Sequence, residues 1–374
     1  MPKVNSEDQI LSLLDAEFPR RHPGLILGRG DDCAEFFSAS PLAVSSDLFL
    51  EHIHFRRSYF TAEEVGYKAL AVNLSDLAAA GAYPSGFSLN LICPPALDSA
   101  WLAAMFKGMA ALARECDLPL VGGDISAGAS LGLCITVWGG SRAGVSGPEA
   151  PGAFLRRGAQ EGDVLFLLGP QNPWDACSLG LAALGLEVLE KYGRAAIKDY
   201  PEACAALLSP KPMLSAGQAM SSLLLEPGWA GRPAPLKAMD LSDGLRRDLP
   251  RLLGGFQQQL AAGAVFAPEN CRTAASLGAG LTFTVENLHP ELTAYHAGLE
   301  QKALGMALSG GDEYALLCAC APEKMDFLRK TLAERGGAPA LQILGLVTER
   351  EGIRWQGIRL ADILPGTGFD HFEV

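Results

Sequence analysis

Aspartates recur where apolar stretches of this chain end, most of them beside Gly or Ser. They lie in Gly30-Asp31-Asp32, Ser45-Ser46-Asp47, Asn73-Leu74-Ser75-Asp76, Gly122-Gly123-Asp124 and Asp240-Leu241-Ser242-Asp243-Gly244. One such motif is ordinary turn chemistry, but five of them predict buried elements that deliver carboxylates to a shared cleft. Carboxylates that converge repel each other unless cations lie between them. Hard oxygen ligands favour Mg²⁺ or Mn²⁺, and Mg²⁺ usually binds together with substrate phosphates.

The length of the chain and the order of its elements predict a mixed α/β protein with two domains. At 374 residues the chain is long for a single core. A stretch rich in Gly, Pro and Ala between residues 139 and 152 places the boundary there, giving domains 1–148 and 149–374. Helical and strand patterns alternate in both halves.

Charge and cysteine usage narrow the classes of partner. The net charge is −12 and Lys and Arg form no run, which argues against nucleic acid and anionic membranes as partners. The nine Cys include no CxxC pair, and the N-terminus is polar and then amphipathic rather than a signal peptide. We therefore expect a cytoplasmic protein with reduced thiols. No apolar run approaches ~18 residues, so no membrane span is expected.

Hydrophobic periodicity and capping residues predict where individual helices and strands lie. A strand is predicted over residues 42–50, carrying Asp47 near its end, and a capping box at Thr61 and Glu64 opens a long helix that runs to about Ala80. On that helix the side chains of Lys68, Asn73 and Asp76 fall within an arc of ~140° around the helix axis, so they lie on one side of it. The remaining predicted helices are 8–18, 98–116, 176–192 and 245–253. Further strands are predicted at 87–92, 118–121, 131–138, 163–168, 238–240, 304–308, 314–320 and 341–347.

Several familiar nucleotide and metal motifs do not occur in the sequence. It contains no GxxxxGK[ST], GxGxxG, HExxH, HRD or DFG. The spacing of His52 and His54 is typical of an alternating strand rather than a metal site. P-loop and protein-kinase designs are therefore excluded, whereas phosphoryl transfer organised by several metal ions stays possible, since it depends mainly on positioning and charge neutralisation.

The aspartate motifs and three further motifs follow one another along the chain in the order found in a known family. The helix motif runs from Tyr67 to Ala78, and Ala307-Leu308-Ser309-Gly310-Gly311 and Gly368-Phe369-Asp370-His371-Phe372 follow the other motifs. From about residue 25 to its C-terminus the chain resembles the thiamine-monophosphate kinase family, in the superfamily of aminoimidazole-ribonucleotide synthetase. The resemblance implies a two-domain α/β fold and a homodimer whose N-terminal domains form a shared β-barrel. It also implies ATP-dependent phosphorylation of thiamine monophosphate to thiamine diphosphate.

The resemblance assigns roles by motif position. The residues that would hold Mg²⁺ are Asp32, Ser45, Ser46, Asp47, Asp76, Asp124, Asp240 and Asp243. The residues that would contact ATP are Gly123, Asp124, Arg156 and Ser242. The residues that would lie at the substrate are His54, Asp312 and Gly366.

Four segments depart from the family pattern, and they concentrate in the acceptor half. They are Ile125-Ser126-Ala127, Trp174-Asp175-Ala176, Gly311-Asp312-Glu313-Tyr314 with its two acids exchanged, and Gly366-Thr367 where an aromatic residue is usual. Two other interpretations stay open on these grounds. One is a kinase or ATP-dependent synthetase of the same superfamily that acts on another small molecule, and the other is a non-catalytic nucleotide-binding relative.

Overall fold

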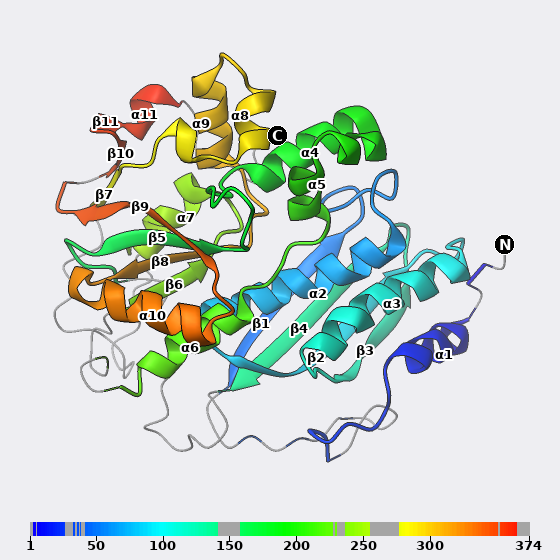
Figure 1. Cartoon of the computed structure of the whole chain (residues 1–374). Coiled ribbons are helices and arrows are strands. Elements are labelled where there is room, and N and C mark those ends of the chain that lie inside the picture. The colour runs from blue at the N-terminus through cyan, green and yellow to red at the C-terminus, as the bar shows by residue number, and fades with distance from the viewer. Residues whose placement is uncertain are drawn as a thin grey trace, which may run out of the picture.

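A computed structural model describes most of the chain. The described residues are 3–4, 6–26, 33, 36, 38, 42–140, 158–226, 229, 236–254, 277–350 and 352–364. Within them the chain forms two β-sheets, each with helices packed on it (Figure 1). The first sheet belongs to the N-terminal part of the chain and the second to the rest.

The first sheet has four described strands in the order β1-β4-β2-β3. They are β1 (Ala43–Leu50), β2 (Tyr83–Cys93), β3 (Leu120–Ala127) and β4 (Gly132–Gly140). β4 pairs antiparallel with both β1 and β2, and β3 pairs parallel with β2. Helices α2 (Ala62–Ala79) and α3 (Ser99–Glu115) lie side by side across one face, with α1 (Glu7–Glu17) beside α3 (Figure 1).

Helix α2 begins at the capping box that the sequence predicts. The Thr61 hydroxyl accepts from the Glu64 N–H at 3.2 Å, and the Glu64 carboxylate accepts from the Thr61 N–H at 2.7 Å. The helix lies between the first sheet and the second half of the molecule, so most of its surface is buried. Even Lys68 and Asn73 are 0% and 1% exposed.

The second sheet has seven described strands in the order β11-β10-β7-β9-β5-β8-β6. They are β5 (Val164–Gly169), β6 (Leu236–Asp240), β7 (Gly278–Leu281), β8 (Leu316–Cys320), β9 (Ala340–Thr348), β10 (Gly352–Trp355) and β11 (Ile358–Arg359). Only β7 and β10 pair parallel among them. The α-helices of this half are α4 (Leu181–Tyr192), α5 (Pro201–Leu208), α6 (Leu214–Leu223), α7 (Leu245–Leu252), α8 (Pro290–Tyr295), α9 (Glu300–Ser309), α10 (Met325–Arg335) and α11 (Leu360–Ile363).

Some sequence predictions were wrong in detail. Residues 304–308 belong to helix α9 rather than to a strand, because a short apolar run has no period that separates the two. Helix α4 begins at Leu181 rather than Ala176. His52 and His54 lie in a turn after β1, where His52 adopts a φ of 71°. Asp47 and Asp124 lie inside strands rather than at their ends.

The two halves are packed together around α2. Helix α6 and strand β6 of the second half both contact α2, and one continuous apolar core includes residues of both halves. The predicted domain boundary at residues 148 and 149 lies outside the described residues. None of the helices in the described part combines the length and hydropathy needed to cross a membrane.

Candidate functional site

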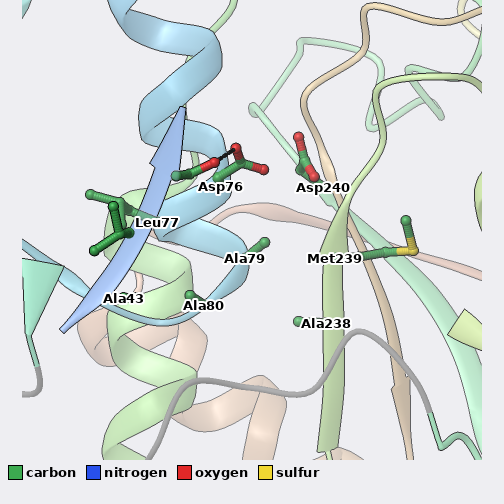
Figure 2. A pocket seen from close by; sticks show the side chains of 10 residues that line it. Ala43, Asp76, Leu77, Ala79, Ala80, Ala238, Met239 and Asp240 are labelled. Atoms are coloured by element: carbon green, nitrogen blue, oxygen red, sulfur yellow. Dashed lines mark hydrogen bonds between the residues drawn. The ribbon is translucent and has the colours of Figure 1, made fainter. Parts of the chain in front are cut away.

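A pocket of about 280 Å³ opens where α2, β1 and β6 meet. Figure 2 shows Asp76 of α2 and Asp240 of β6 on facing sides of it, so each half of the molecule supplies one carboxylate. The residues that line the pocket are Ala43, Val44, Ser45, Asp76, Leu77, Ala79, Ala80, Ala238, Met239 and Asp240. The other lining side chains are apolar, so the serine and the two aspartates supply the side-chain oxygen donors of the pocket.

Strand alternation places one serine of β1 at the pocket and the next on the opposite face. Ser45 donates a hydrogen bond to the Asp76 carboxylate. Ser46 faces away, where its hydroxyl lies 2.9 Å from that of Thr136. The Asn73 side chain joins β1 to α2, since its Oδ1 accepts from the Asp47 N–H at 3.2 Å while its Nδ2 donates to the Ala69 carbonyl.

The loop after β6 is held by a buried carboxylate. Asp248 is fully buried, and its Oδ2 accepts from the N–H groups of Ser242 and Asp243 at 3.1 and 2.9 Å. Arg251 then bridges Asp248 Oδ1 at 2.6 Å and Asp243 Oδ2 at 2.7 Å. Arg247 lies 3.6 Å from the same Asp243 oxygen. Asp243 therefore forms ion pairs with two arginines, and its role as a metal ligand stays a prediction.

Gly123 and Asp124 lie on β3, at the opposite edge of the first sheet from β1. Asp124 is exposed, and the residues beside it across the sheet are Asn90, Cys134 and Leu48. Neighbours in register share a face, so Asp124 lies on the open face of the sheet rather than the face that α2 covers. Three strand spacings separate β1 from β3, or about 14 Å. Within one chain Asp124 is thus remote from the pocket.

Gly123 occupies a position that only glycine fits. Its φ is 150°, and a Cβ there would lie 1.8 Å from the Leu89 carbonyl oxygen. The predicted ATP contact therefore lies on a backbone segment with no side chain to keep a ligand at a distance.

The predicted substrate residues lie beside a buried lysine. Lys68 Nζ contacts Asp312 Oδ2 at 3.0 Å, and the Tyr314 hydroxyl donates to Asp312 Oδ1 at 2.9 Å. Burial by itself raises the pKa of Asp312, but Lys68, Tyr314 and His54 together outweigh it and the net shift is downward. Asp312 is therefore a carboxylate at neutral pH. The Nδ1 of His54 accepts from the Leu50 N–H at 3.0 Å.

Tyr314 is the second partner of the Asp312 carboxylate. Burial raises its pKa well above the ordinary value, and the charges of Asp312, Asp240 and Asp47 raise it further. The phenol stays protonated and acts as a donor. Sequence reasoning missed both Tyr314 and Lys68 as parts of the site, although a lysine within an apolar helix is a signal that a buried partner is present.

The oxygen donors at the pocket suit a hard divalent cation, because hydroxyl and carboxylate oxygens are the ligands that Mg²⁺ prefers. Within the described ranges no group of three or more His, Cys, Asp or Glu side chains lies close enough together to hold a metal ion. The pocket brings together Ser45, Asp76 and Asp240. Asp32, Arg156 and Gly366, which complete the predicted site, lie outside the described residues.

Comparison with known proteins places this geometry in a family. Residues 30–140 match the family model described as AIR synthase related protein, N-terminal domain. Over 352 residues the chain is 32% identical to a thiamine-monophosphate kinase of Escherichia coli (strain K12), covering 93% of this chain and 92% of that protein. The chain belongs to the thiamine-monophosphate kinase family. The thiamine-monophosphate kinase of Synechococcus elongatus is 30% identical over 373 residues, covering 98% of this chain and 97% of that protein.

A solved structure of the thiamine-monophosphate kinase family has the same fold. The crystal structure of thiamine-monophosphate kinase from Stenotrophomonas maltophilia K279a is 27% identical and superposes with a TM-score of 0.71. The match covers 95% of this chain and 98% of that one. The predicted mixed α/β fold of the synthetase superfamily is thereby confirmed.

Proposed function

We propose that this protein transfers the γ-phosphoryl group of ATP to the phosphate of thiamine monophosphate, giving thiamine diphosphate and ADP. The observation that carries the proposal is the pocket between the two halves, where Ser45, Asp76 and Asp240 meet on a chain that matches thiamine-monophosphate kinases over nearly its full length. All three residues belong to motifs that the family resemblance assigns to the metal site.

The chemistry needs no general base from the protein. The acceptor is itself a phosphate, already ionised at neutral pH, so the main obstacle is repulsion between two polyanions. Bound Mg²⁺ would supply charge neutralisation on the phosphate oxygens. Ser45, Asp76 and Asp240 would hold it in the pocket. The metal-binding roles of Asp32, Ser46, Asp47, Asp124 and Asp243 stay predictions, since within one chain Ser46 and Asp124 lie on the other face of the sheet and Asp243 pairs with two arginines.

We also propose a homodimer formed through the open face of the first sheet, as a shared β-barrel. That face carries the exposed side chains of Val44, Leu48 and Ile92, at 63%, 56% and 45%. The position of Asp124 supports this arrangement, because a second copy packed on the open face would bring its own Asp124 toward this chain. We place the enzyme in the cytoplasm, since each cysteine in the described part is a free thiol.

The test is ADP release in a coupled assay with thiamine monophosphate, other thiamine phosphates and no acceptor, at saturating Mg-ATP. We expect turnover with thiamine monophosphate and a loss of more than ~10-fold for Asp76→Asn, because the amide keeps the shape and removes the charge that faces the cation. Asp326→Asn, an exposed acid on α10, is the matched control. Absence of thiamine monophosphate turnover in wild type that still binds Mg-ATP would favour another small acceptor.

A further inference from the structure

Lys68 is a buried charge inside a helix that carries part of the pocket. Its side chain is fully buried among the apolar residues of α2, where an ammonium group is costly unless it is paired. Its partner, Asp312, comes from a turn of the other half, 244 residues further along the chain. The Nζ also lies 5.7 and 5.9 Å from the ring centroids of Phe60 and Tyr314, within the range of a cation–π contact.

The turn that Lys68 contacts is strained. Asp312 and Tyr314 adopt φ values of 66° and 51°, in the left-handed region that side chains rarely occupy. Such residues persist only where their surroundings hold them. The Tyr314 hydroxyl bonds back to the Asp312 carboxylate, so the Lys68 ammonium and the Tyr314 phenol occupy its two oxygens.

The same turn contacts both elements that bring carboxylates to the pocket. On the α2 side it meets Lys68 and Ser75, whose hydroxyl donates to the Tyr314 carbonyl at 3.3 Å. These two residues are seven positions apart and so lie on one face of the helix, and Ser75 directly precedes Asp76. On the β6 side the turn bonds to the two residues that follow Asp240, because the N–H groups of Asp312 and Tyr314 donate to the carbonyls of residues 242 and 241.

We propose that Lys68 is a positioning residue for the pocket: its ion pair with Asp312 holds turn 312–314 against α2 and thereby sets the separation of Asp76 and Asp240. This role rests on the metal binding proposed above for those two acids. It adds a residue that acts on the pocket through the turn.

The experiment measures Mn²⁺ binding in the presence of ATP by electron paramagnetic resonance, which needs no turnover. Lys68→Met should lower Mn²⁺ affinity by ~10-fold or more, as losses of residues that orient metal ligands do. Lys107→Met is the matched control, because it makes the same change at an exposed position of α3 and should bind Mn²⁺ like wild type.

A double variant separates positioning from simple charge balance. Lys68→Met leaves the Asp312 carboxylate without its cation and should lower the melting temperature. Lys68→Met/Asp312→Asn removes both charges, so its melting temperature should return most of the way to that of wild type. If Lys68 positions the turn, the folded double variant still binds Mn²⁺ more weakly than wild type. Wild-type Mn²⁺ affinity in that variant would overturn the proposal.

The same measurements keep the two proposals apart. A wild-type protein that binds Mn²⁺ with ATP but leaves thiamine monophosphate unphosphorylated contradicts the proposed function, and the Lys68 comparison still decides the positioning role. A wild-type protein that binds no Mn²⁺ with ATP overturns the positioning role, because there is then no metal site to position.

Discussion

At the scale of single residues, the carboxylates near the pocket differ in the kind of partner they have. Some are paired with a cationic side chain, whereas another is bonded to a neutral hydroxyl. Asp248 accepts backbone N–H groups and an arginine, which makes it a structural support for the loop after β6. Asp312 pairs with Lys68. Asp76 accepts a hydrogen bond from the neutral hydroxyl of Ser45, which leaves its charge available to a cation. The kind of partner thus distinguishes supporting acids from candidate ligands.

Glu313 leads to a prediction about pH. Its Oε1 accepts from the Ala182 N–H at the start of α4, yet burial raises its pKa from 4.5 to about 8. Between these values the folded state binds more protons than the unfolded state, so the free energy of unfolding falls as pH rises through this window. Glu313→Gln keeps a carbonyl oxygen as acceptor but cannot titrate. The variant should therefore lack the decrease in the free energy of unfolding that Glu313 causes.

Urea unfolding of wild type and Glu313→Gln at several pH values across that window checks the prediction. The difference in stability between the two proteins should grow in favour of the variant up to about pH 8 and then level off. A constant difference across the window would show that Glu313 does not titrate there.

At the scale of elements, the crossing of α2 and α3 depends on two glycines. A Cβ on Gly66 would lie 1.9 Å from the Met105 carbonyl oxygen, and one on Gly108 would lie 2.1 Å from that of Glu63. The two backbones therefore touch at this crossing. Because α2 carries Lys68, Ser75 and Asp76, the close crossing also fixes the helix that presents the pocket acid.

We expect Gly66→Ala to destabilise the protein by about 1–3 kcal/mol, since overpacking outweighs the better helix propensity of alanine. Chemical denaturation is the measurement. Gly122→Ala is the control, because a Cβ there meets nothing within 4 Å. Equal stability of the two variants would mean that the helices separate at little cost.

At the scale of the whole molecule, the helices that the structure describes cover one face of the first sheet and leave the other open. The open face carries Val44 and Leu48 on β1 and Ile92 on β2 as exposed apolar side chains. Both edge strands of this sheet, β1 and β3, have one described neighbour each. Exposed edges and an apolar face favour pairing with another chain.

Sedimentation velocity should therefore find a homodimer at micromolar concentration. Leu48→Glu/Ile92→Glu should give a folded monomer, because charges on the open face oppose burial without altering a residue that lines the pocket. Ile343→Glu, at an exposed position on β9 of the other sheet, should remain a dimer. A monomeric wild type would contradict the proposed assembly.

Sequence reasoning found those parts of the fold and site whose signals are local. The capping box of α2 is formed by neighbouring residues, and the DLSDG motif is followed by the helix it predicts. Ser45, Asp76 and Asp240 were all predicted from their motifs and do meet. The strand predicted at 304–308 failed because five apolar residues fit either element, and packing of α9 decided between them.

By itself the sequence determined which residues carry the oxygen donors and which short segments hold them, because caps and turns depend on contacts within a few residues. Only the tertiary structure decided which donors meet. The strand order β1-β4-β2-β3 separates Asp124 from the pocket, and the packing of the two halves pairs Lys68 with Asp312 across 244 residues. Strand order and the packing of distant segments depend on the whole core, so no local motif specifies them.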